Sequence, residues 1–242
     1  MEGTVRVKQL NESFVGRNNE NLEAARNRLI RGNTYRDLST VCIVATRGMI
    51  PAKVVSSWLS MATPMNQKFV RIFVEKMEVA DAYNTGVEIV MNHPELSKWR
   101  FLLTIEEDNC PPQDGLLMLY ESIDKFDAIS GLYWVKGENG SAMCYGNPKV
   151  MPKDFVPQIP IPDTVMEVNG IGQGFALFKM DIFKRVQKPW FKTLQHYVPG
   201  QGMTAATQDL YFCMEAAKQG CRFAVDTRCR VGHWDQQNQT MW

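Results

Sequence analysis

Short apolar runs and longer segments of helical spacing alternate along the first half of the chain. The apolar runs have the length and the Val, Ile, Leu and Phe content of strands that are covered on both faces. They occupy residues 41–45, 69–74 and 101–105, and the predicted helices that follow them occupy residues 52–62, 80–92 and 114–123. Strands that alternate with helices in this way predict an α/β domain with a mainly parallel sheet flanked by helices.

The second half of the chain has shorter strand signals and predicts a smaller antiparallel portion. A strand over residues 127–134 is followed by one over residues 141–145, and Asn139-Gly140 between them is a favoured hairpin turn. Later strands are expected at residues 165–168, 175–178, 222–225 and 228–232, and a helix at residues 204–218. Five prolines between residues 147 and 163 predict an irregular loop, of the kind that often covers a binding site.

Gly170, Gly172 and Gly174 interrupt the pattern directly before the strand expected at residues 175–178. Their spacing matches a dinucleotide fingerprint, but that fingerprint needs a helix N-terminus for the pyrophosphate, and here a strand follows. We therefore reject that interpretation. The remaining interpretations are a plain turn and a place where the backbone closely approaches another group.

Composition and charge leave the partners of the chain open. The 242 residues are 45% hydrophobic, and 27 Lys and Arg balance 26 Asp and Glu, so no bulk attraction to nucleic acid or membrane is expected. No apolar run reaches the roughly 18 residues of a membrane span, and the polar N-terminus lacks the apolar core of a signal peptide. We therefore expect a cytoplasmic protein, with an N-terminal helical extension over residues 1–40 whose helix occupies residues 19–31.

Six cysteines are expected to be free thiols, because a chain of this size without a signal peptide rarely carries a disulfide framework. One alternative is a zinc site made by Cys213, Cys221, Cys229 and His233. Their spacing lacks the close C-x₂-C pair that is typical of zinc sites, and this disfavours the alternative.

Three acidic residues, Glu106, Glu107 and Asp108, come directly after the apolar run at residues 101–105. Alternation along an extended backbone places Glu106 and Asp108 on one side and Glu107 on the other. Carboxylates crowded at the carboxyl end of a buried strand suit a hard divalent cation, because the cation removes their mutual repulsion. The alternative is a solvated turn. Other strand ends are expected to bring three more residues to the same crevice: Thr46, Arg47 and Glu75.

Four features follow one another between residue 41 and about residue 235. They are the triplet Glu106-Glu107-Asp108 with Pro111-Pro112 after it, the run Gly172-Gln173-Gly174-Phe175, the segment Asp209-Leu210-Tyr211-Phe212-Cys213 with Gly220 after it, and Asp226 followed by His233. This order resembles that of the GT-A-fold glycosyltransferases, enzymes that transfer a sugar from a nucleotide-sugar donor. Tyr83, Glu106 and Gln208 depart from that family's pattern, which has Arg, Asp and Glu at the matching positions.

The resemblance implies a single GT-A-like, Rossmann-type catalytic domain over residues 41–242. Its nucleotide-binding half would span about residues 41–110 and its acceptor half about residues 111–242. The implied reaction is metal-dependent, because Mn²⁺ or Mg²⁺ stabilises the nucleoside diphosphate as it leaves. The implied metal ligands are Glu106, Asp108 and His233, and a His among carboxylates favours Mn²⁺.

Asp209 is the implied general base, which takes the proton of the acceptor hydroxyl, and this role implies inversion at the anomeric carbon. The remaining site residues are expected to bind the donor or to lie beside its sugar. They are Thr46, Arg47, Glu75, Asp81, Asn84, Glu107, Trp134, Gly172 and Gly174. The partner is therefore a nucleotide-sugar, and the acceptor is left open among a glycan, a small molecule, a protein and a modified DNA base.

Two alternatives remain beside the glycosyltransferase interpretation. A nucleotidyltransferase would usually carry a glycine-rich phosphate loop after the first strand, where this chain has Ala45-Thr46-Arg47-Gly48. A nucleotide-sugar-binding module with a decayed site would explain the departures at Tyr83, Glu106 and Gln208. The donor base, the sugar, retention against inversion and the oligomeric state are not readable from the sequence.

Overall fold

The computed structural model describes residue 31 and residues 36–64, 67–137, 140–198 and 202–242, and between residues 196 and 206 it describes at most the backbone. The predicted extension over residues 1–40 and its helix at residues 19–31 therefore lie almost wholly outside the described residues. Asn139 of the predicted hairpin turn lies outside them too. Among the described helices, none is long and apolar enough to cross a lipid bilayer.

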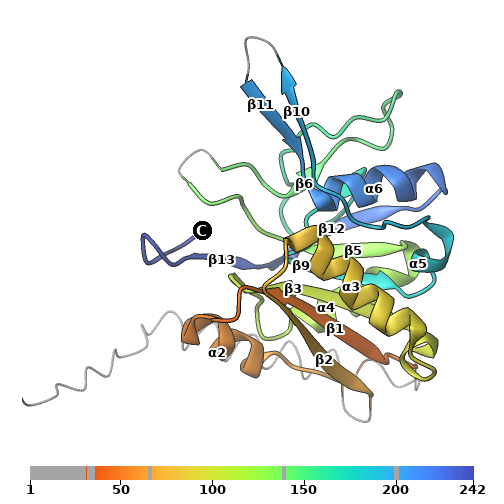
Figure 1. Cartoon of the computed structure of the whole chain (residues 1–242). Helices are drawn as coiled ribbons and strands as arrows, with labels where there is room; N and C mark the ends of the chain where they lie inside the picture. The colour runs from red at the N-terminus through yellow and green to blue at the C-terminus, as the bar shows by residue number, and fades with distance from the viewer. Residues whose placement is uncertain (1–30, 32–35, 65–66, 138–139, 199–201) are drawn as a thin grey trace, which may run out of the picture.

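A seven-stranded sheet forms the centre of the molecule (Figure 1). Its strands lie in the order β2 (Phe69–Glu75), β1 (Thr40–Thr46), β3 (Phe101–Glu106), β9 (Phe175–Lys179), β5 (Ala128–Leu132), β12 (Phe223–Arg230) and β7 (Val165–Val168). β1 is parallel to β2 and β3, and β12 is parallel to β5, whereas β9 and β7 run antiparallel to their neighbours. The predicted α/β class with a mainly parallel sheet is confirmed.

Helices cover both faces of the sheet, because alternate residues of a strand point to opposite faces. Along β1, Ile43 enters one core and Val44 enters the other. The first core is closed by α3 (Val79–Asn92), α5 (Ile182–Arg185) and α6 (Gln208–Lys218), and the second by α2 (Ala52–Ser60) and α4 (Gly115–Ser122). Each Leu, Ile or Phe buried in these cores contributes roughly 1.5–3 kcal/mol, so the apolar pattern fixes the position of the central strands.

Smaller elements surround this frame. Two short 3₁₀ helices are η1 (Leu96–Lys98) and η2 (Ile123–Lys125). The small sheets are the hairpin of β10 (Leu194–Val198) and β11 (Gly202–Ala206), the pair of β6 (Cys144–Tyr145) and β8 (Gly170–Ile171), and the three-stranded sheet of β14 (Thr240–Met241), β13 (Gly232–Asp235) and β4 (Asn109–Cys110). The smaller antiparallel portion predicted from the sequence is therefore present, and the β10–β11 hairpin projects from the body of the molecule in Figure 1.

Two predicted element boundaries are wrong. The helix expected at residues 204–218 begins only at Gln208, because residues 202–206 pair with β10 as strand β11. Most of the two strands expected at residues 222–225 and 228–232 is one strand, β12, which continues past a register shift between Asp226 and Arg230, and Gly232 already begins β13. In both places pairing with another strand decides the backbone conformation, through a hairpin in the first case and through distant β5 in the second, and this pairing outweighs local propensity.

The predicted hairpin after β5 forms in its first part. Met143 N–H donates to the carbonyl oxygen of Tyr133 at 2.9 Å, and Val135 N–H donates to that of Ser141 at 3.0 Å. Cys144 then leaves the hairpin and pairs with Ile171 of β8. The loop over residues 147–163 has no helix and no named strand, as its prolines predicted.

Candidate functional site

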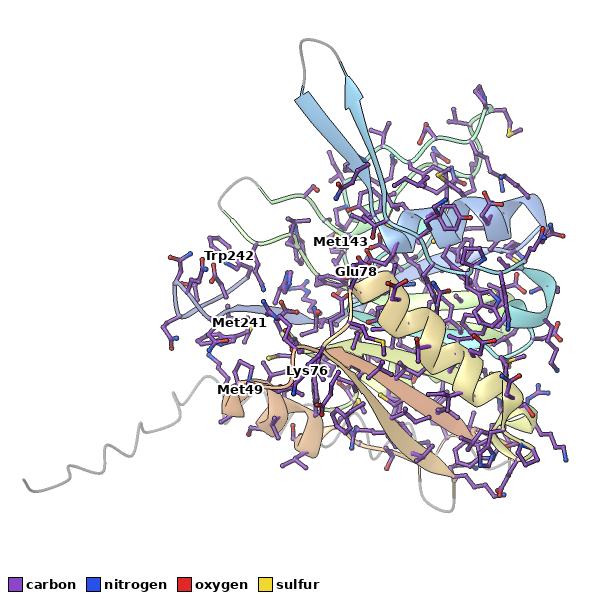
Figure 2. The ribbon with its side chains drawn as sticks, in the orientation of Figure 1. Met49, Lys76, Glu78, Met143, Met241 and Trp242 are labelled. Atoms are coloured by element: carbon purple, nitrogen blue, oxygen red, sulfur yellow. The ribbon has the colours of Figure 1, made fainter. Side chains whose placement is uncertain are left out.

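The carboxyl ends of β1, β2 and β3 meet at one edge of the sheet. In the register of these parallel strands, Thr46 lies opposite Glu75 and Ala45 lies opposite Glu106. Figure 2 shows further side chains on this side of the molecule, from segments far apart in the sequence. They are Met49 after β1, Lys76 and Glu78 after β2, Met143 of the hairpin, and Met241 and Trp242 at the end of the chain.

Glu107 turns toward the end of β1, away from its two acidic neighbours. Its Oε2 accepts hydrogen bonds from Thr46 Oγ1 at 2.7 Å and from Arg47 N–H at 2.8 Å, and its Oε1 pairs with Arg47 Nε. Burial opposes ionisation, but these hydrogen bonds and the Arg47 charge outweigh it and lower the pKa of Glu107. Glu107 therefore fixes the loop after β1, and Arg47 keeps most of its side chain exposed.

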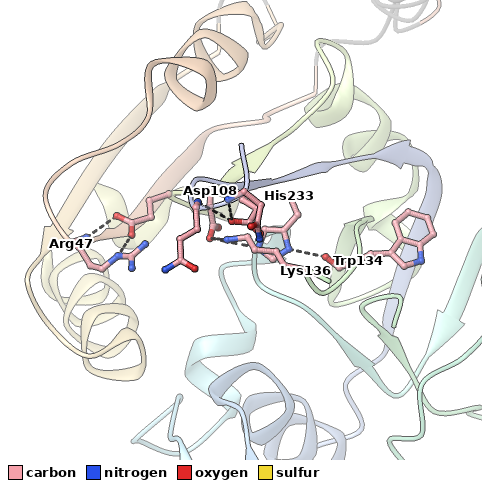
Figure 3. Close-up of polar contacts among 9 residues, drawn as sticks. Arg47, Asp108, Trp134, Lys136 and His233 are labelled. Carbon is pink, nitrogen blue, oxygen red and sulfur yellow. Dashed lines mark hydrogen bonds and ion pairs between the residues drawn. The ribbon is translucent and has the colours of Figure 1, made fainter. Parts of the chain in front are cut away.

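Asp108 and His233 form the centre of the site, because β4 pairs with β13 and places His233 opposite Asn109. Asp108 Oδ2 lies 3.6 Å from His233 Nε2 and 2.5 Å from the ammonium nitrogen of Lys136 (Figure 3). The other ring nitrogen of His233, Nδ1, lies 2.7 Å from the carbonyl oxygen of Trp134. That carbonyl can only accept a hydrogen bond, so Nδ1 carries an N–H, and Nε2 is the ring nitrogen that faces Asp108.

Asp108 and Glu106 have pKa values shifted in opposite directions. Burial opposes ionisation of Asp108, but hydrogen bonds and attraction from His233 and Lys136 outweigh it and lower its pKa to about 2. Burial raises the pKa of Glu106 to about 8, and repulsion from Asp108 and Asp209 adds to that shift. At neutral pH Asp108 is therefore an anion, and the Glu106 carboxyl is largely protonated.

The residues expected to bind a metal are only partly brought together. Over the residues that the structure describes, no three His, Cys, Asp or Glu side chains gather where they could hold a metal ion. Asp108 and His233 are adjacent, but Glu106 is not part of the pair, and Lys136 occupies the same Asp108 oxygen. The donor set present therefore does not fit the expected Glu106–Asp108–His233 site.

The alternative zinc site is excluded because no cluster of three candidate ligands forms among the described residues and because its cysteines lie on opposite faces of the sheet. Cys213 and Cys221 lie in the core on one face of the sheet, and Cys229 lies in the core on the other face. All three are free thiols, and burial raises the pKa of Cys213 and of Cys221. The prediction of free cysteines holds for all six.

Asp209 lies in the first turn of α6, with 4% of its surface exposed. Thr207 Oγ1 and the Leu210 N–H both donate hydrogen bonds to its Oδ1, the latter at 2.8 Å. Burial nevertheless raises the pKa of Asp209. Its charge contributes to the raised pKa values of Glu106 and Tyr133, so it faces the same interior as the end of β3.

The predicted glycine turn is a place of close approach. A Cβ at Gly172 would lie 2.3 Å from Tyr133 Oη, and one at Gly174 would lie 2.5 Å from Asn109 Oδ1. Gly174 N–H also donates to Tyr133 Oη at 2.8 Å. Of the two interpretations left open by the sequence, the structure selects close packing against Tyr133 and Asn109.

Asp81 and Asn84 lie apart from the acidic triplet, in a groove of about 510 Å³ at the start of α3. The other wall of this groove is the segment over residues 189–195. The Asn84 amide is occupied by the backbone of Phe191: Nδ2 donates to its carbonyl oxygen at 2.7 Å and Oδ1 accepts from its N–H at 3.1 Å. The structure thus divides the expected donor-binding residues between this groove and the edge around Arg47.

Comparison with known proteins finds solved structures of similar fold but no matching sequence family. No protein-family profile matches the chain, and no curated protein matches it by sequence. Among solved structures, A197 from STIV superposes with a TM-score of 0.59 at 16% identity, covering 84% of this chain and 93% of that chain. The chain has a GT-A-like fold.

S. aureus TarS is a more distant match to this GT-A-like chain. The structure of TarS 1–349 gives a TM-score of 0.41 at 13% identity, over 78% of this chain and 58% of that chain. TarS 1–349 in complex with UDP-GlcNAc gives 0.42 at 15% identity, over 78% of this chain and 56% of that chain. The chain thus spans less than two thirds of the TarS structures it matches.

Two residues of the site were not predicted. Lys136 reaches Asp108 across 28 positions of sequence, and Tyr133 reaches Gly174 across 41. Both belong to the hairpin that carries Trp134, which was predicted as a site residue. Trp134 contributes its backbone carbonyl to His233. The hairpin signal was therefore in the sequence, but which of its side chains enter the site depends on tertiary packing.

Proposed function

We propose that the chain is a glycosyltransferase that moves a sugar from a nucleotide-sugar donor to an acceptor hydroxyl. One observation carries the proposal: Glu106 and Asp108 lie at the carboxyl edge of a GT-A-like sheet, and the charges of Asp108 and Asp209 both raise the pKa of the half-buried Glu106. Ligands of open α/β sheets bind at this edge. The fold is shared with GT-A-type glycosyltransferases, which supports a transferase.

Asp209 is the proposed general base. Burial raises its pKa and makes it a stronger base than an exposed aspartate. Thr207 Oγ1 and the Leu210 N–H both donate to Oδ1, and Oδ2 is the oxygen proposed to take the proton of the acceptor hydroxyl. A base that deprotonates the acceptor on one side of the sugar ring implies inversion at the anomeric carbon.

The donor is proposed to lie over the loop that follows β1. Glu107 holds Thr46 and Arg47 in place, and the exposed Arg47 guanidinium supplies hydrogen-bond donors for phosphate oxygens. Glu75, beside Thr46 at the end of β2, lies at the same edge. The dependence on Mn²⁺ expected from the sequence stays a prediction: Asp108 and His233 are adjacent, and no cluster of three candidate ligands forms among the described residues.

Thermal-shift measurements test the donor first. The full chain is screened with a panel of nucleotide-sugars that includes UDP-GlcNAc, each in EDTA and in Mn²⁺. A ligand that binds the folded state raises its apparent stability by about 2.7 kcal/mol at 100 times its Kd. A shift with one nucleotide class identifies the donor base, and no shift with any member of the panel contradicts the proposal.

Asp209→Asn tests the reaction. The variant should bind the donor normally and lose transfer by roughly 10²–10⁴-fold, the usual contribution of a general base. Glu215→Gln is the matched control, because Glu215 lies on the same helix and pairs with Lys218. Near-normal turnover by Asp209→Asn would remove Asp209 from this role. Release of pyrophosphate in place of a nucleoside diphosphate would identify a nucleotidyltransferase.

A further inference from the structure

A small cavity at the edge of the sheet contains two acids, and each already has a cation from the chain. Its lining includes Arg47, Glu107, Asp108, Lys136 and Trp234. Glu107 is paired with Arg47, and Asp108 is paired with Lys136 at 2.5 Å. The negative charge that would attract a divalent cation is therefore balanced within the protein.

A divalent cation held between Asp108 and His233 would compete with the Lys136 ammonium. Lys136 already contacts Oδ2, the oxygen that faces His233 Nε2 at 3.6 Å. Two cations held within about 4 Å of each other repel by several kcal/mol at the effective dielectric of a protein surface. Both oxygens of Glu107 already accept hydrogen bonds from Thr46 and Arg47, so this carboxylate is turned toward the loop after β1.

The same cavity is well suited to an anion. Lys136 carries three N–H donors, of which Asp108 takes one, and Arg47 carries five, of which Glu107 takes Nε. A third cation, Lys53, lies 4.3 Å above the ring of Trp234, which is part of the cavity wall. Phosphate oxygens bind such groups by short, charge-assisted hydrogen bonds.

We propose that Lys136 supplies the positive charge that faces the diphosphate of the donor, so that donor binding needs no divalent cation. This inference rests on the proposed function and concerns the same site. In the reaction, the acceptor oxygen forms a bond to the anomeric carbon, and the bond from that carbon to the diphosphate oxygen breaks. The electron pair stays on the nucleoside diphosphate beside Lys136 and Arg47, and the hydroxyl proton passes to Asp209.

Titration calorimetry in EDTA tests the proposal on the full chain. The probes are UDP, GDP, ADP, CDP and dTDP, each also measured as the nucleoside without phosphates. We expect one diphosphate to bind in EDTA, Lys136→Met to weaken its binding at least tenfold, and Lys136→Arg to retain most of it. The matching nucleoside should bind wild type and Lys136→Met equally. Lys125→Met, at an exposed lysine in η2, is the charge-matched control and should bind as wild type does.

The outcomes separate this inference from the proposed function. A diphosphate that binds only with Mn²⁺, with binding unchanged or strengthened in Lys136→Met, would show that Lys136 does not hold the diphosphate. That result overturns the inference, and the glycosyltransferase proposal stands. If no nucleoside diphosphate binds in EDTA or in Mn²⁺, both fail. A thermal unfolding curve of each variant identifies any loss of binding that comes from misfolding.

Discussion

The Nε2 atom of His233 lies 3.6 Å from Oδ2 of Asp108, and the opposite ring nitrogen lies 2.7 Å from the carbonyl oxygen of Trp134. One imidazole thus joins three distant segments: the acidic turn after β3, the hairpin after β5 and the C-terminal strand β13. Because Lys136 of the same hairpin also contacts Asp108, this carboxylate is a structural junction as well as a site residue.

Asp108→Asn should remove a pH dependence of stability. The folded pKa of Asp108, about 2, lies below the value of about 3.9 for an unfolded Asp. The stabilisation is therefore present above pH 4 and is lost as the pH falls toward 2, and it amounts to about 2 kcal/mol. Urea unfolding of wild type between pH 5 and pH 2.5 should lose this increment, and Asp108→Asn should not. Parallel curves for the two proteins would contradict the ion-pair account.

Glu106→Gln should stabilise the protein at alkaline pH. Burial, Asp108 and Asp209 raise the pKa of Glu106 to about 8, above its unfolded value. A carboxyl whose pKa is raised on folding costs nothing at pH 4, and its cost grows as the pH rises to 8. The free energy of unfolding of Glu106→Gln should therefore exceed that of wild type by more at pH 8.5 than at pH 5.

The control for this experiment is Glu88→Gln, at an exposed residue paired with Lys188. Its offset from wild type should stay nearly constant between the two pH values, because a surface ion pair contributes little. An equal offset for Glu106→Gln at pH 5 and pH 8.5 would show that its carboxyl ionises normally.

Asn84→Ala should destabilise the fold by roughly 1–3 kcal/mol, because it leaves the N–H and the carbonyl oxygen of Phe191 without their partner. Denaturant unfolding measures the change. Asn92→Ala, at the exposed last residue of the same helix, is the control and should change stability by less than about 0.5 kcal/mol. Unchanged stability with weaker nucleotide binding would instead assign Asn84 to the donor, as the sequence predicted.

Gly172→Ala should cost roughly 1–3 kcal/mol, because its new methyl group would lie 2.3 Å from Tyr133 Oη. Tyr133→Phe removes that oxygen, and it also removes the acceptor of the Gly174 N–H. The double variant should therefore be more stable than the sum of the two single changes predicts, by at least about 0.5 kcal/mol. Strictly additive effects in a double-mutant cycle would show that the turn relaxes away from Tyr133.

The alternation of apolar runs and helical segments was enough to predict the class of the fold. Strands such as β1 and β3 are buried on both faces, so each of them appears in the sequence as a short run of apolar residues. The acidic triplet was located in the same way, and the rule that strand ends meet at one edge placed Glu75 and Thr46 side by side.

Local patterns failed where pairing decided the conformation. Nothing between residues 202 and 206 indicates strand β11, which exists because β10 lies beside it. The same is true of the long strand β12, whose continuation beyond Asp226 follows from its place next to β5. In each case another strand pairs with the backbone groups, the hairpin neighbour β10 for β11 and the distant strand β5 for β12, and that pairing outweighs local propensity.

The sequence by itself determined the α/β class, the order of the central elements and the residue types of the site. Only the tertiary structure decided which of those residues meet. The pairing of β4 with β13 brought His233 to Asp108, the hairpin after β5 added Lys136 and Tyr133, and Phe191 took the amide of Asn84. Such contacts join residues far apart in the chain, and they form because burying both faces of the sheet fixes where every loop at its edge begins and ends.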